Sequence, residues 1–463
     1  MKILITGGTG FIGQAVCEAL GHQGHELVVI TRNPDQARCV IPAPHQALKW
    51  DFLNTEPLQD TQALQNIDAV IHLAGESILG QRWTTEYKDR LYRSRVTATE
   101  NLIETLKKHS QTFPKVFLSA SAIGYYGDRG DEVLEESAQP GAGFLAQICQ
   151  DWEKALEKLP QGSTRSVALR IGIVLGQGGG ALKEMLGPFS LGVGGPLGGG
   201  SQWMSWIHLN DLVKIILESL HRDSLSGPVN CCSAQPVRNR EFTQTLAKSL
   251  RTHAWIPAPK LGLQAALGEG SCALLSSQRV EPKKLKDAHF TFEYPTLDLA
   301  LDSIFSDNEA CGLSELKQKC WIPLPIESVF EFFSDARNLE KITPPWLHFK
   351  ILGQSSEQIQ AGTTIDYQLK LHGIPLRWRT EISSWNPPHE FTDTQLKGPY
   401  RVWKHTHRFS PLRGGTLMED RVLYQIPMGY LGKLVAGSWV KGDVTEIFRY
   451  RNTTIFDLLL KKA

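Results

Sequence analysis

The hydrophobic pattern changes period three times within the first 32 residues. Residues 2–6, KILIT, form a continuous apolar run that is typical of a buried strand. After a glycine-rich turn at 7–13, apolar residues recur at helical spacing as far as residue 20, and 26–32, ELVVITR, read as a second strand. This order predicts a β-α-β unit.

The same alternation continues through the first two thirds of the chain. Strand-like runs occur at 68–75, 115–121 and 166–176, and helical patterns lie near 86–109 and 144–159. Such alternation predicts an α/β fold with a Rossmann-type, doubly wound parallel sheet.

Residues 176–200 contain eleven glycines in 25 positions, too many for a helix. We interpret this segment as a mobile loop over the carboxyl edge of the sheet, with a disordered linker as the alternative. Because regular patterning resumes at 206–220, a lid within the domain is favoured.

A different pattern begins after about residue 314. Apolar periodicity fades over 301–314, which we interpret as a linker, and 325–342 then suggests a helix. The runs 376–382, 401–409 and 416–426 alternate as antiparallel strands do, and 444–460 suggests a long helix with one apolar side. A curved sheet around this helix would enclose an apolar cavity.

Composition narrows the choice of partners and compartment. The net charge is +1 with no dense Lys/Arg cluster, so we expect no nucleic-acid partner. The eight cysteines are scattered without a C-x-x-C pair, which suits reduced thiols better than disulfides or zinc. No signal peptide or apolar run of about 18 residues is present, so we expect a cytoplasmic protein without an integral membrane segment.

The turn GGTGFIG carries the first candidate site. Gly7 suits the tight turn, Gly10 allows a pyrophosphate to approach the backbone, and Gly13 allows helix and strand to pack closely. Phe11 and Ile12 open the helix whose N-terminus would face the phosphates. The turn therefore predicts dinucleotide binding.

The end of the second predicted strand bears on which dinucleotide binds. NAD sites usually place an acidic residue there for the ribose 2′-hydroxyl, whereas this chain has Thr31 and Arg32. An arginine suits a 2′-phosphate, so NADP is favoured over NAD; a solvated Arg32 without a ligand is the alternative.

Several further motifs carry a family resemblance: HLAGE (72–76), SASAIGYYG (119–127), LRIGIVLG (169–176), WIHLNDL (206–212) and LLSSQRVEPKKL (274–285). With GGTGFIG, they resemble the extended short-chain dehydrogenase/reductases, the NAD-dependent epimerase/dehydratase group, and within it an atypical branch of uncharacterised "epimerase family" proteins. The resemblance covers 1–300, with about 250–300 as a C-terminal, family-specific part. Residues 315–463 resemble the START-like, polyketide-cyclase-like (SRPBCC) proteins, α+β helix-grip domains that bind hydrophobic ligands.

The resemblance implies roles for single residues. It implies that Leu73, Ala74 and Gly75 line the nicotinamide-ribose side, that Arg95 approaches the cofactor, and that Ser121 holds the position of the catalytic Ser/Thr. Ser121 also ends a predicted central strand, where open α/β sheets bind ligands, although a strand-end cap is the alternative.

The chain departs from the family at the acid/base pair. Most relatives have a Tyr and, four residues later, a Lys that lowers the Tyr pKa, but this chain has Phe144 and Ile148, which transfer no proton.

Other residues offer substitutes for that pair. Tyr125 and Tyr126 are the first candidates, with Arg129 as a cation favouring a phenolate. Glu76 and His208 are candidates for contact with substrate, His208 as a proton shuttle near pH 7; each of these residues also has a purely structural interpretation.

Two hypotheses follow from these features. The first is an NADP-dependent oxidoreductase or epimerase acting by hydride transfer on a small molecule, with an apolar ligand in the second domain. The second is a non-catalytic NADP(H) sensor or lipid-like ligand carrier. His405 and His407 share a strand face, but the sequence shows no third ligand, so we expect packing or a polar contact rather than a metal. The helix over 86–109 suits either a homodimer contact or packing on the sheet.

Overall fold

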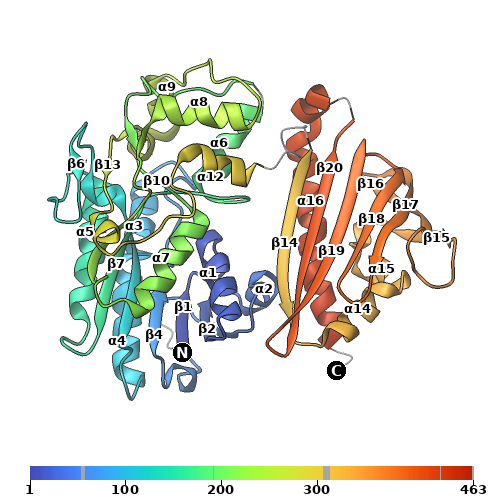
Figure 1. Cartoon of the computed structure of the whole chain (residues 1–463), viewed down its shortest axis with the longest axis horizontal. Coiled ribbons are helices and arrows are strands. Elements are labelled where there is room, and N and C mark those ends of the chain that lie inside the picture. Colours follow the sequence, from blue (N-terminus) through green and yellow to red (C-terminus); the bar gives the residue numbers. More distant parts are fainter. Residues whose placement is uncertain (54–57, 191, 306–312, 428, 461–463) are drawn as a thin grey trace. The chain divides into compact units, whose positions relative to one another are not determined.

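The computed structural model describes residues 1–53, 58–190, 192–305, 313–427 and 429–460. The chain divides into two compact units (Figure 1). The first comprises Met1–Pro34 and His45–Ser306, and the second comprises Asp35–Pro44 and Asp307–Ala463. The segment Asp35–Pro44, which the sequence placed in the first domain, is thus grouped with the second unit.

The first unit is built on a seven-stranded parallel sheet of order β11-β7-β5-β4-β1-β2-β3. The core strands are buried along their length, which requires cover on both faces of the sheet. This confirms the predicted Rossmann-type fold. The strands are β1 (Lys2–Thr6), β2 (Glu26–Thr31), β3 (Gln46–Lys49), β4 (Ala69–His72), β5 (Val116–Ala122), β7 (Arg165–Ile171) and β11 (Gly227–Cys231).

Helices cover this sheet, with α1 beside α7 and α4 beside α5. The helix predicted over 86–109 is two helices, and where the chain turns between them the Arg95 guanidinium donates to the carbonyl of Leu91 (3.1 Å). The apolar side of α4, including Leu102 and Leu106, is buried in the sheet core, as expected for a sheet-packing helix. The helices are α1 (Phe11–His22), α3 (Thr85–Arg93), α4 (Val96–His109), α5 (Phe144–Ala155) and α7 (Leu209–His221).

The glycine-rich segment is more regular than predicted. A helix, α6 (Gly180–Ser190), occupies its first half, so the prediction of an irregular loop is wrong there. The preceding glycines pack on the Phe11 ring: a Cβ at Gly179 would lie 2.3 Å from Phe11 Cδ2. Glycine is needed here for close approach to an aromatic ring.

The run predicted over 166–176 also differs, since it splits into β7 and a short strand, β8 (Ile173–Leu175), which pairs with β10 (Trp206–His208). The other short elements of the unit are β6 (Val133–Leu134), β9 (Trp203–Met204), β12 (Val237–Arg238), β13 (Arg279–Val280), α8 (Asn239–Ser249), α9 (Lys260–Leu267), α10 (Cys272–Leu275), α11 (Lys283–Asp287) and α12 (Leu297–Ile304). The helix α2 (Pro34–Val40) follows β2 in the chain.

The second unit is a seven-stranded antiparallel sheet of order β14-β20-β19-β18-β17-β16-β15 with a long helix, α16 (Gly429–Leu460). Val444 and Phe448 of α16 pack with Val422 and Tyr424 of the sheet, which confirms the helix-grip prediction. The strands are β14 (Ser314–Ile322), β15 (Lys350–Gln354), β16 (Thr364–Leu371), β17 (Ile374–Asn386), β18 (Glu390–Lys397), β19 (Val402–Leu412) and β20 (Gly415–Gln425).

Two helical predictions in this unit need correction. The pattern over 325–342 forms α14 (Ile326–Ser334) and α15 (Arg337–Ile342), because Asp335 leaves the helical conformation and accepts hydrogen bonds from Arg337. The last helix begins at Gly429, well before the predicted start. Among the described residues, we find no helix of the length and apolarity needed to cross a membrane.

We expect the substitution Ile455→Ala to destabilise the second unit. Ile455 of α16 is fully buried in an apolar cluster with Phe409 and Met418. Its truncation should lower the free energy of unfolding by about 2–5 kcal/mol, which denaturant titration would measure. Leu396→Ala, at a half-exposed side chain, is the control and should cost far less; equal losses would contradict this packing.

Candidate functional site

The glycine turn after β1 leaves no room for side chains at two positions. Gly7 has φ +71°, and a Cβ there would lie 2.7 Å from the carbonyl carbon of Leu73. A Cβ on Gly13 would lie 2.1 Å from the Gly7 carbonyl oxygen, so helix α1 rests directly on the turn. The amide of Gly10 donates to the same carbonyl oxygen (2.9 Å), which closes the turn.

The N-terminus of α1 is open to a ligand. Gly10 occupies the N-cap position, no side chain caps the helix, and its first turn contains no acidic residue. The amides at the start of the helix, Phe11 and Ile12 among them, therefore keep their donors for an anion, and the helix dipole favours negative charge there. This arrangement fits the pyrophosphate of a dinucleotide.

The end of β4 is fixed against the same turn. Thr6 Oγ1 contacts His72 Nδ1 (2.7 Å) and accepts a hydrogen bond from the Ala74 amide (3.2 Å), and the Leu73 amide donates to the Thr6 carbonyl (3.1 Å). Burial lowers the pKa of His72 to about 4, so this ring is neutral near pH 7. The structure thus brings Gly7, Leu73 and Ala74 together. Sequence reasoning missed Thr6 and His72, although Thr6 ends one predicted strand and His72 lies within another.

Arg95 supports the loop after β4. Its Nη2 donates to the Glu76 carbonyl (2.7 Å), and a Cβ on Gly75 would lie 3.5 Å from its Cζ. The Glu76 amide donates to Ser94 Oγ (3.1 Å), so the backbone of the loop is held from two sides. Arg95 therefore lies next to Glu76 and positions the backbone of the loop that carries Glu76.

The end of β2 presents a free cation. Thr31 Oγ1 accepts from the Asn33 amide (3.2 Å), which turns the chain, and Arg32 is exposed. Within the described ranges, the Arg32 guanidinium makes no hydrogen bond or ion pair. It is available for an anionic group of a ligand.

Ser121 belongs to a buried charged network. Its hydroxyl donates to Glu153 Oε1 (2.7 Å), and Arg170 binds both carboxylate oxygens of Glu153 (2.8 Å each). The strand register explains this, because Ser121 of β5 lies opposite Arg170 of β7. Glu153 and Arg170 were not singled out from the sequence, although Arg170 lies in one of the motifs that carry the family resemblance, residues 169–176.

The two tyrosines have different surroundings. The Tyr126 hydroxyl donates to Asn230 Oδ1 (2.7 Å) and accepts from Arg170 Nη1 (2.9 Å), and burial raises its pKa to about 12. Tyr125 is partly exposed and its ring lies under the Arg170 guanidinium (3.5 Å from centroid to Cζ).

The cation beside these tyrosines is not the predicted one. Arg129 binds the Glu132 carboxylate instead, because that acidic side chain lies three residues along the same turn. Arg170, from a distant strand, takes the place next to both rings.

His208 caps the start of helix α7. Its Nδ1 accepts from the Asn210 amide (3.1 Å) at the start of α7, and its ring contacts the Tyr294 ring at a tilt of 37° (3.8 Å between centroids). Burial lowers its pKa to about 4, which does not support the predicted proton exchange near pH 7.

Phe144 and Ile148, at the positions of the usual acid/base pair, lie in apolar surroundings in this chain. Ile148 is buried in a cluster with Tyr87 and Leu91, and the Phe144 ring packs edge-on against Trp83. Neither position is available for proton transfer, so any acid or base must come from elsewhere.

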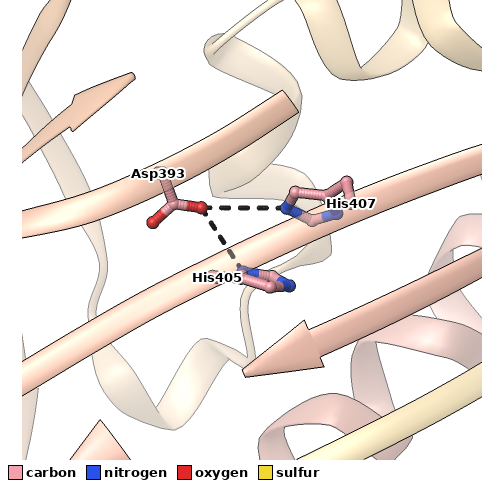
Figure 2. A group of neighbouring side chains, drawn as sticks. All are labelled: Asp393, His405 and His407. Atoms are coloured by element: carbon pink, nitrogen blue, oxygen red, sulfur yellow. Dashed lines mark ion pairs between the residues drawn. The ribbon is translucent and has the colours of Figure 1, made fainter. Parts of the chain in front are cut away.

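The second unit contains the predicted cavity, of about 180 Å³. Its wall is largely apolar, with aliphatic and aromatic side chains, and His405 and His407 open onto it from β19. Asp393 of β18 lies beside both rings (Figure 2), with its Oδ2 3.4 Å from His405 Nδ1 and 3.8 Å from His407 Nε2. The sequence argument against a metal rested on a missing third ligand, and the structure supplies a candidate. The apolar and aromatic residues of the wall include Phe333, Leu339, Ile342, Tyr367, Trp378, Tyr400, Trp403 and Phe448.

The fold and the phosphate loop define a Rossmann-type dinucleotide-binding protein joined to a helix-grip domain. Three family models match the chain: "NAD dependent epimerase/dehydratase family" over 3–232, "Domain of unknown function (DUF1731)" over 258–304, and "Polyketide cyclase / dehydrase and lipid transport" over 322–446. The chain belongs to the NAD dependent epimerase/dehydratase family.

Similar proteins match the first two thirds of the chain. The chloroplastic epimerase family protein SDR39U1 homolog of Arabidopsis thaliana is 36% identical over 66% of this chain and 86% of its own length. The crystal structure of human SDR39U1 with NADPH is 34% identical, with a TM-score of 0.59 over 66% of this chain and 99% of that one. UDP-glucuronic acid 4-epimerase of Bacillus cereus, at 18% identity and TM-score 0.54 over 66% of this chain and 98% of that one, shares the fold.

Gly13→Ala should weaken dinucleotide binding. The added methyl group would lie 2.1 Å from a carbonyl oxygen, so α1 must move away from the turn. We expect the Kd for NADPH, measured by calorimetry, to rise at least about tenfold. Gly187→Ala, where a Cβ has nothing within 4 Å, is the matched control; equal affinity in both variants would rule out this role of the turn.

Arg32→Ala should weaken NADPH binding and leave NADH binding unchanged. The lost contact is a charge-assisted one of about 1.5–3 kcal/mol, so the NADPH Kd should rise about tenfold or more. NADH, which lacks the 2′-phosphate, is the internal control. A parallel loss for both nucleotides would show that Arg32 does not read the 2′-phosphate.

Proposed function

We propose that the chain is an NADP-dependent oxidoreductase or epimerase that acts by hydride transfer at an oxygen-bearing carbon of a small molecule. The observation that carries this proposal is the uncapped N-terminus of α1 above a glycine turn that excludes Cβ atoms. Arg32 at the end of β2 is exposed and has no ion-pair partner among the described residues, which supports NADP over NAD, and the human relative's structure contains NADPH.

In this proposal, different residues of the chain bind different parts of the cofactor. Gly7, Gly10 and Gly13 seat the pyrophosphate, and the loop 73–75 positions the nicotinamide side. Bound NADP(H) supplies the hydride chemistry. The proton must then be exchanged by the protein or by solvent.

We infer that Tyr125 is the better placed of the two tyrosines for that exchange. Its hydroxyl makes no hydrogen bond within the described part of the chain, and the Arg170 cation lies over its ring. The Tyr126 hydroxyl, in contrast, already donates to Asn230 and accepts from Arg170. Ser121 donates its proton to Glu153, so its oxygen can accept but not donate toward a substrate while that bond holds.

A second candidate function is a non-catalytic NADP(H) sensor or lipid-like ligand carrier. Ile148 is buried among apolar side chains and Phe144 packs against Trp83, which removes the family's usual proton transfer. We propose that an apolar ligand occupies the cavity of the second unit in either case. A cytoplasmic location and a homodimer remain predictions from the sequence.

Tyr125→Phe should reduce turnover without weakening cofactor binding. Loss of an acid/base group lowers kcat about 100-fold or more. The assay follows NADPH oxidation with a fractionated metabolite extract, and calorimetry checks that the Kd for NADPH is unchanged. Tyr126→Phe is the control: it should retain turnover while lowering stability by about 1–3 kcal/mol, since buried partners lose their hydrogen bonds.

Two results would redirect this assignment. Equal turnover in the wild type and Tyr125→Phe would remove Tyr125 from the chemistry. Tight NADPH binding with no oxidation by any fraction would favour the sensor.

A further inference from the structure

A row of polar side chains crosses three neighbouring strands of the second unit. Asp393 of β18 is the register partner of His405 on β19, and His407 is the register partner of Asp420 on β20. Directly opposed residues share a face of a sheet, so all four point to the same side as the cavity-lining aromatic residues. His405, His407 and Asp420 are each at most 3% exposed.

Asp420 lies beside one nitrogen of each histidine ring and is hydrogen-bonded to that of His405. Its Oδ1 lies 3.3 Å from His405 Nε2 and 2.6 Å from His407 Nδ1. The second nitrogen of each ring is therefore directed the other way, toward Asp393. Metal-binding histidines are commonly oriented in this manner, with a carboxylate at the nitrogen that does not bind the metal.

The spacing on the Asp393 side fits a shared cation better than direct hydrogen bonds. Asp393 Oδ2 lies 3.4 Å from His405 Nδ1 and 3.8 Å from His407 Nε2, whereas N–H···O bonds measure about 2.7–3.2 Å. Four ligands at about 2.1 Å from a tetrahedral zinc ion lie about 3.4 Å apart. One ligand atom from each residue lies within 4.8 Å of the others, and Figure 2 shows the three side chains converging.

We propose that Asp393, His405 and His407 form a binding site for a divalent transition metal in the second unit, with Asp420 as the carboxylate that orients both rings. Two imidazoles and one carboxylate suit Zn²⁺, Fe²⁺ or Co²⁺. The two carboxylates carry two negative charges, which match a divalent cation. Three protein ligands leave coordination positions open, as in catalytic or ligand-binding metal sites.

The lining of the cavity indicates which kind of ligand would occupy the open coordination positions of the metal. His405, His407 and Asp393 line it together with Trp378 and Trp403. Arg451 of α16 lines the same cavity, and its Nε has no hydrogen-bond partner among the described residues. A metal and a guanidinium facing one apolar cavity favour an apolar ligand that carries a carboxylate.

The test is a titration of the full chain, stripped with a chelator, with Co²⁺. We expect one Co²⁺ per chain, detected by its visible d–d absorption and displaced by Zn²⁺. Asp393→Asn and His407→Gln should lose this stoichiometric binding, and Asp420→Asn should weaken it about 10–100-fold. His389→Gln, at an exposed histidine of the same unit, is the control and should bind normally.

A second measurement avoids the variants and their folding. X-ray absorption of the wild-type protein loaded with one equivalent of Zn²⁺ should show two imidazole ligands together with oxygen. Sulfur ligands would place the metal on cysteines and overturn the proposal. Absence of stoichiometric binding, or binding that survives in a folded Asp393→Asn variant, would overturn it as well.

Discussion

The close contact between the first turn and the first helix is the constraint on which the nucleotide site depends. Helix α1 rests on the Gly7 carbonyl with no space for a Cβ at Gly13. The same turn contacts the backbone of Leu73. Three separate segments are thus brought together by backbone contact alone. Because side chains are absent from this junction, the helix N-terminus and the loop after β4 can both face a dinucleotide. Thr6 then adds the hydrogen bond that fixes Ala74.

A buried ion pair lies beside Ser121 and the two tyrosines, while the positions expected for the acid/base pair hold Phe144 and Ile148. Arg170 binds Glu153 through two hydrogen bonds, contacts Tyr126 and covers Tyr125. A buried pair of this kind stabilises little by itself, but loss of one partner leaves an uncompensated charge. Arg170 thereby links the positions of Ser121 and both tyrosines. Under the proposed function, proton exchange at this site must be compatible with that network.

The sequence predicts what local patterns determine and misses what distant partners determine. The first β-α-β unit was predicted almost to the residue because strand, turn and helix are each encoded within a few positions. Arg129 was the predicted cation because it is close in sequence, whereas Arg170 reaches the tyrosines only through the register of β5 and β7. The helix α6 was missed because glycines required for contact with Phe11 look the same as loop glycines.

The contrast between local patterns and distant partners also explains why the cluster of two histidines and two aspartates in the second unit could not be predicted from the sequence. The shared face of His405 and His407 follows from strand alternation, but Asp393 joins them only because β18 pairs with β19. Burying two histidines and two carboxylates in an aromatic wall costs free energy unless every charge is compensated. Apolar side chains at these positions would continue the core formed by Phe391 and Phe409. Since a helix-grip fold does not need such a group for its packing, its presence beside a cavity argues for a role in binding.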